Sequence, residues 1–63
     1  MTLRDLYCYT SDTQNFIVLA ESGNEGIPLF QGKLEDCDSE LMDEIVDHFT
    51  VSVDRDIIVT LCI

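Results

Sequence analysis

Carboxylates are the commonest chemically active groups in this chain, and they crowd into one stretch. Residues 35–47 hold seven Asp or Glu residues and no basic residue. The same stretch has the apolar rhythm of an amphipathic helix, which predicts a helix over about residues 39–49, capped by Asp38 or Ser39. Its inward stripe would be Leu41, Met42, Ile45, Val46 and Phe49.

Four carboxylates of this helix have the spacing of a second, exposed face. We call this set, together with two acids that precede it, the acidic ridge: Asp36, Asp38, Glu40, Asp43, Glu44 and Asp47. Acidic helix faces usually carry lysines that relieve like-charge repulsion, and this one carries none. We therefore expect the ridge to bind a partner with a basic surface, against the alternative that it only keeps the protein in solution.

Metal chemistry is the first alternative use of these acids. The run from Asp36 to Glu40 begins like a calcium loop, but such a loop needs Gly at its sixth position and Glu at its twelfth. Leu41 and Asp47 stand there instead. The three cysteines and His48 lack the paired spacing of a zinc site. We expect no metal and no cofactor.

Catalysis is the second alternative. His48 is the only histidine, and the three cysteines, Cys8, Cys37 and Cys62, stand in no nucleophile motif. The glycines form no phosphate-binding loop, and a chain this short has little depth for a pocket. We expect no catalytic residues and no enzymatic activity.

Composition narrows the class of partner. The 63 residues include 13 acids against three bases, for a net charge of −10. Direct binding to nucleic acid or to an anionic membrane is therefore disfavoured. With no export signal, no membrane span and an odd number of cysteines, the expected location is the cytoplasm, with reduced thiols.

The remaining elements predict an α+β fold in one domain, residues 1–63, with the order α-β-β-α-β-β and a four-stranded, mainly antiparallel sheet. A capping box at Thr2 and Asp5 predicts a helix over about 3–9. The other elements expected are strands at 15–21, 27–34, 50–53 and 57–63, with turns at 22–26 and 54–56. Pro28 favours an edge position for the second strand. The last two strands could instead form one long, bent strand.

The final strand is apolar on both faces, which predicts self-association. Residues 57–63 alternate so that one helix layer could cover only one side. The other side would present Ile58, Thr60 and Cys62 to a second copy in a homodimer. The alternative is that the N-terminal helix covers this second face.

Four segments together resemble small acidic proteins encoded by bacteriophages and prophages, some of which are anti-CRISPR proteins that block Cas nucleases. They are T-L-R-D-L at 2–6, I-P-L-F-Q-G-K at 27–33, D-S-E-L-M-D-E at 38–44 and V-S-V…I-I-V-T-L-C-I at the end. The resemblance implies an inhibitor of a nucleic-acid-binding effector in the bacterial host cytoplasm. Its acidic ridge would occupy a basic groove as a DNA mimic. The alternatives are a phage assembly module that functions by oligomerising, and a small DNA-acting enzyme.

Overall fold

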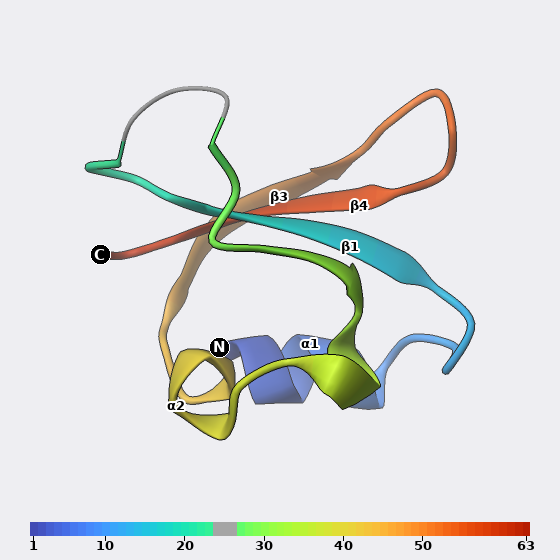
Figure 1. The fold of residues 1–63 in the computed structure, drawn as a ribbon, viewed down its shortest axis with the longest axis horizontal. Coiled ribbons are helices and arrows are strands. Elements are labelled where there is room, and N and C mark those ends of the chain that lie inside the picture. The colour runs from blue at the N-terminus through green and yellow to red at the C-terminus, as the bar shows by residue number, and fades with distance from the viewer. Residues whose placement is uncertain (24–26) are drawn as a thin grey trace.

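A four-stranded mixed sheet carries two short helices on one of its faces (Figure 1). The computed structural model describes residues 1–23 and 27–63. In chain order the elements are α1 (Leu3–Cys8), β1 (Asn15–Ala20), β2 (Phe30–Lys33), the 3-10 helix η1 (Leu34–Asp36), α2 (Ser39–Met42), β3 (Val46–Val51) and β4 (Ile57–Leu61). The predicted α+β class is therefore confirmed.

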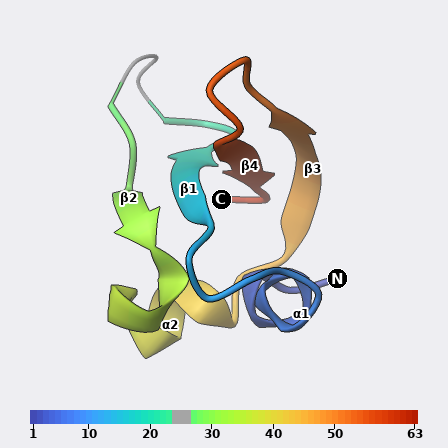
Figure 2. The same ribbon diagram turned by 90° about the vertical axis from the view of Figure 1, so that its right-hand side faces the viewer.

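The strands lie in the order β2-β1-β4-β3, so that the first and last strands of the chain are the central pair. β1 and β4 are parallel, whereas the outer pairs β1–β2 and β3–β4 are antiparallel. The expectation of a mainly antiparallel sheet is thus correct only for the two outer pairs. In Figure 2, η1 and α2 carry the chain along the helix side of the sheet from edge strand β2 to edge strand β3.

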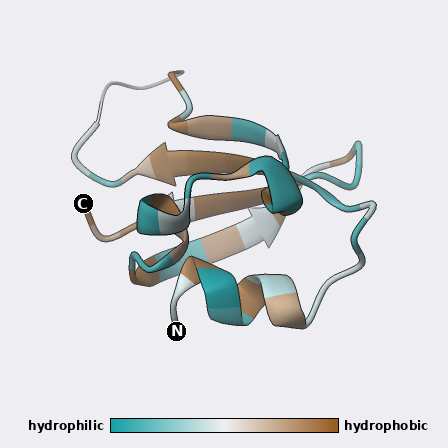
Figure 3. Ribbon diagram, turned by 60° about the horizontal axis from the view of Figure 1, so that its bottom comes forward, coloured by the Kyte–Doolittle hydropathy of each residue, from teal (hydrophilic) through white to brown (hydrophobic). Residues whose placement is uncertain are grey.

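The core lies between the helices and the inner face of the sheet. Alternating residues of β1 and β4 point into it, since Val18 pairs with Val59 in the parallel register. The buried apolar side chains are Leu3, Leu6, Phe16, Val18, Leu34, Met42, Val59 and Leu61. Figure 3 shows mostly apolar strands behind helices that alternate between polar and apolar residues. Each fully buried side chain of this kind contributes about 1.5–3 kcal/mol.

The N-terminal capping box forms as predicted. The Thr2 hydroxyl accepts a hydrogen bond from the Asp5 N–H at 3.2 Å, and the Asp5 carboxylate accepts one from the Thr2 N–H at 3.0 Å. These bonds satisfy two backbone donors that a helix start would otherwise leave unpaired. α1 ends at Cys8, one residue before the predicted end.

The predicted helix over 39–49 is wrong. Asp38 caps α2 as expected, but α2 ends at Met42, and β3 begins at Val46. The β-branched residues from Ile45 onward lose side-chain freedom in a helix and fit a pleated strand. Pairing with β4 gives these residues the backbone hydrogen bonds that a helix would otherwise have supplied. The helical spacing of the apolar residues therefore does not decide between helix and strand.

The closing hairpin forms, and the single bent strand is excluded. The first strand of this hairpin is Val46–Val51 and not 50–53, and the second ends at Leu61 and not at Ile63. β3 and β4 pair antiparallel, and Arg55 takes a positive φ of 66° in the turn, which contains no glycine. The first hairpin also pairs antiparallel, but β2 starts at Phe30, later than expected, and its turn at 22–26 lies partly outside the described residues. Pro28 precedes β2, which occupies the predicted edge position.

Candidate acidic binding surface

Residues 35–44, which we call the acidic segment, hold six carboxylates and wrap the helix side of the sheet. Buried side chains anchor the segment at both ends: Leu34 is buried before it, and Met42 near its end. Cys37 and Leu41 also pack against the core. Because these four residues face inward, the acids between them are turned to solvent.

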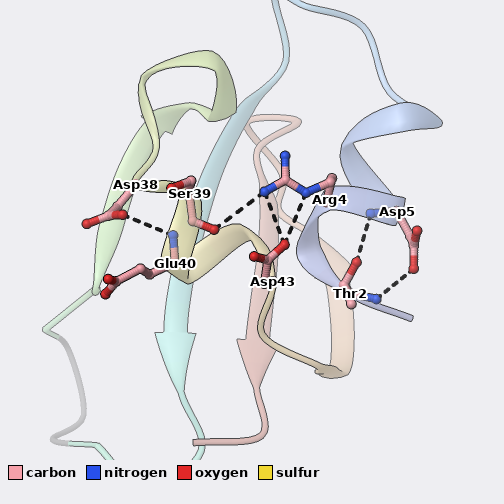
Figure 4. Close-up of polar contacts among 7 residues, drawn as sticks. All are labelled: Thr2, Arg4, Asp5, Asp38, Ser39, Glu40 and Asp43. Atoms are coloured by element: carbon pink, nitrogen blue, oxygen red, sulfur yellow. Dashed lines mark hydrogen bonds and ion pairs between the residues drawn. The ribbon is translucent and has the colours of Figure 1, made fainter.

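The geometry of the segment follows from two short helical turns rather than one long helix. The Asp38 carboxylate accepts a hydrogen bond from the Glu40 N–H at 3.0 Å and so starts α2 (Figure 4). Of the six carboxylates, five are exposed, namely Glu35, Asp36, Asp38, Glu40 and Asp43, and Glu44 is half-buried.

Arg4 is the base that reaches the acidic segment. Its guanidinium donates to the Asp43 carboxylate at 3.1 and 3.2 Å, and to the Ser39 carbonyl at 3.5 Å (Figure 4). Within residues 1–23 and 27–63, the other ion pair joins His48 and Asp47. Asp43 is therefore partly neutralised, while the other exposed acids of the segment have no ion-pair partner among the described residues.

Asp47 lies elsewhere, so the six predicted ridge residues do not form one face. It sits on β3, where the pairing with β4 shifts register between Val46 and His48. Its carboxylate meets the His48 Nδ1 at 2.6 Å and accepts a hydrogen bond from the Cys62 Sγ at 3.8 Å. The prediction that the acidic ridge forms one helix face is therefore wrong. Its residues divide between the acidic segment and the β3–β4 hairpin.

Glu21 joins Asp47 and Cys62 in a cluster whose potential ligand atoms all lie within 4.8 Å of one another. Carboxylate oxygens and a thiolate are groups that bind divalent cations. Desolvation, followed by the nearby Asp47 and Glu21 charges, raises the pKa of the Cys62 thiol, which keeps it protonated and a poor ligand at neutral pH. Sequence reasoning missed Glu21, because only the pairing of β1 with β4 and of β4 with β3 brings these residues together.

A hollow of about 240 Å³ opens beside the β1–β2 pair. Its lining residues are Asn15, Phe16, Ile17, Gln31, Gly32 and Asp56, so Asp56 is the single ionisable side chain that the described part of the chain contributes to its wall. Acid–base or nucleophilic catalysis needs a second ionisable or nucleophilic group beside such a carboxylate, and the lining residues of this hollow supply none.

The residues expected at an oligomer interface lie on the face of the sheet opposite the helices. Ile58 and Thr60 are half-buried there and Cys62 is exposed. Both helices pack on the other face, so the alternative in which the N-terminal helix covers this one is wrong. All three cysteines are free thiols.

Neither α1 nor α2 approaches the length and apolar character of a membrane-crossing helix, and no other helix among the described residues does. No protein-family model, no curated protein and no solved structure matches this chain.

Proposed function

We propose that this protein is a small acidic binding protein that docks on a basic surface of a nucleic-acid-binding effector and inhibits it without catalysis. The observation that supports this is the acidic segment, where five carboxylates are exposed and, among the described residues, only Asp43 has an ion-pair partner, Arg4. A surface of this sign accelerates encounter with Lys- and Arg-rich grooves and excludes nucleic acid itself.

The contact residues of this proposal are Asp36, Asp38 and Glu40, extended by Glu35. Asp43 contributes less, because it shares its charge with Arg4, and Glu44 is half-buried. Asp47 lies outside this surface. The mimicry of nucleic acid then depends on the density of exposed charge and not on a helical repeat of carboxylates.

In its specific form, the proposal follows the resemblance to phage-encoded proteins: an anti-CRISPR-like inhibitor of a Cas-type nuclease in the cytoplasm of a bacterial host. The second candidate is a phage assembly module, in which oligomerisation is the function. Exposed apolar side chains on β3 favour it, since such surfaces commonly mark protein contacts.

The test neutralises two contact residues and compares them with two acids elsewhere. Asp36→Asn with Glu40→Gln removes two charges from the acidic segment, whereas Asp12→Asn with Asp54→Asn removes two exposed charges outside it. The measurement is inhibition of target-DNA cleavage by a purified Cas-type effector, with affinity measured across a salt series and folding checked by circular dichroism.

We expect the segment variant to bind about tenfold more weakly, equivalent to about 1.4 kcal/mol, and the control to remain near the wild type. Wild-type binding should also weaken steeply with salt. Equal inhibition by the wild type and a folded segment variant would mean that the acids only solubilise, and the assembly-module candidate would then lead.

A further inference from the structure

The outer edge of β3 is an unpaired strand edge that begins beside the N-terminus of the same chain. The Val46 N–H donates to the Met1 carbonyl at 2.8 Å, and the Leu3 N–H donates to the Glu44 carbonyl at 3.0 Å. Met1 to Leu3 therefore cover the edge at residues 44–46. From Asp47 to Val53, where the turn begins, no described element pairs with that side.

Backbone groups along this free edge have a definite direction. The Ser52 N–H donates to the Asp56 carbonyl at 2.8 Å, so the backbone groups of Ser52 point toward β4. Thr50, two residues before Ser52, pairs with Ile58 in the same register and has the same orientation. In an antiparallel ladder the alternate residues point their N–H and C=O away from the partner strand. Phe49 and Val51 thus direct both backbone groups outward.

The same residues expose apolar side chains. Phe49 is 47% exposed, Val51 60% and Val53 99%. By contrast, the apolar residues on the open face of the central strands, such as Ile17 and Ile58, are half-buried by their neighbours. Backbone groups with no partner among the described residues and exposed apolar side chains coincide on β3, as in edges that accept an added strand.

We propose that this edge pairs with the β3 edge of a second copy of the chain, antiparallel about a twofold axis at Thr50, to form a continuous eight-stranded sheet. The length of the free edge fixes the register. The free edge spans residues 47–53, because Met1 to Leu3 cover the edge at residues 44–46 and block a longer overlap. The midpoint of the free edge is therefore Thr50. Phe49 then lies beside Val51 of the second copy, an aromatic and β-branched pair that stabilises antiparallel strands.

The edge is its own complement, since the outward backbone groups of Phe49 and Val51 match those of a second copy, and its local charge does not oppose the pairing. In a chain of net charge −10, residues 48–53 carry no carboxylate. The twofold register sets Asp47 opposite Val53 of the second copy, so no two carboxylates are directly opposite each other along the edge. Because the two chains still repel at long range, the dimer should strengthen with salt, opposite to the salt dependence of binding to a basic partner.

The first experiment measures mass by analytical ultracentrifugation over a concentration series of the full chain. Val51→Pro removes an outward N–H but leaves the β3–β4 ladder intact, and Val51→Lys places a charge in the interface. Ile27→Lys makes the same charge change at a residue of similar exposure, 66%, away from β3. We expect dimers for the wild type and Ile27→Lys, and monomers for both Val51 variants. If Val51→Pro unfolds, Val51→Lys decides.

The second experiment tests the register in a background with Cys8, Cys37 and Cys62 replaced by Ser. Thr50→Cys should form an intermolecular disulfide on mild oxidation, because the two Thr50 positions face each other in a closely spaced pair. Ser52→Cys should not, since it faces His48 of the second copy. Three results would each overturn the proposal. The first is a wild-type protein that stays monomeric at about millimolar concentration, and the second is a Val51→Lys dimer as strong as that of the wild type. The third is cross-linking by Ser52→Cys and not by Thr50→Cys.

Discussion

The Arg4 guanidinium lies 3.1 Å from the Asp43 carboxylate and joins α1 to the end of α2 across 39 residues of chain. Both side chains are largely exposed, at 51% and 70%. Solvent screening therefore limits the strength of this pair. A double-mutant cycle of Arg4→Ala and Asp43→Asn, measured by urea unfolding, should give a coupling free energy below about 1 kcal/mol. A coupling above about 2 kcal/mol would show that the pair is a main tie between the helices.

The apolar residues around β3 differ in how much they stabilise the fold. Leu61 is fully buried, whereas Ile45, which the helical pattern places in the core, is 51% exposed. Leu61→Ala should lower the free energy of unfolding by about 2–5 kcal/mol. Ile45→Ala should cost only about 1 kcal/mol, since half of its side chain is already in water. Urea unfolding of both variants checks this, and similar losses at the two sites would contradict the observed end of α2.

The capping box makes α1 sensitive to acid. Hydrogen bonds from the Thr2 backbone and then the Thr2 side chain lower the pKa of Asp5 from 3.8. A carboxyl whose pKa is lower in the folded protein stabilises the fold above its unfolded pKa, and that stability is lost as the pH falls through the folded value.

We therefore expect the urea midpoint of the wild type to fall more than that of Asp5→Asn as the pH drops from about 5 to below the folded pKa of Asp5. Asp12→Asn, at an exposed acid of the following loop, is the control and should follow the wild type. Parallel pH profiles for the wild type and Asp5→Asn would exclude a stabilising role for the Asp5 charge.

Arg55 occupies a backbone conformation that favours glycine. Its φ is 66°, and its carbonyl accepts a hydrogen bond from the Gln14 Nε2 at 2.6 Å, which any residue at this position can retain. A left-handed conformation costs a non-glycine residue about 1–2 kcal/mol. The greater conformational freedom of glycine in the unfolded chain lowers the free energy of unfolding by about 0.4–1 kcal/mol. Arg55→Gly should thus raise the free energy of unfolding by about 0.5 kcal/mol, and Arg55→Ala should leave it unchanged. Calorimetry of both variants measures the difference, and destabilisation by Arg55→Gly alone would show that the Arg55 side chain holds the turn.

Local signals in the sequence predicted the elements whose determinants lie within a few residues. The capping box at Thr2 and Asp5 fixed the start of α1, since both partners lie in one turn. The alternation of the closing strand predicted its inward residues Val59 and Leu61, because side chains of a strand alternate whatever it pairs with. The acid-rich composition of residues 35–44 likewise led to the candidate surface, as short charged segments stay at the protein–water boundary.

The sequence-based prediction failed where a helical spacing of apolar residues overlapped the start of a strand. Leu41, Met42, Ile45 and Val46 fit a helix, yet only Met42 is buried, and the chain turns at Asp43 to pair with a strand near the C-terminus. Local spacing cannot weigh a helical turn against hydrogen bonds to a strand more than ten residues away. The acidic ridge was lost with that helix, although all of its carboxylates except Glu44 remained exposed.

The sequence by itself determined the sign of the surface, the α+β class and the inward face of the last strand, because charge, composition and alternation are local properties. Only the tertiary structure decided that β1 and β4 form a parallel central pair and that Asp47 meets Cys62 and not Glu40. It also left β3 as an edge between the N-terminal segment and the turn. The physical reason is that strand order and register depend on which distant segments together bury the most apolar surface and satisfy the most backbone groups, which no local pattern encodes.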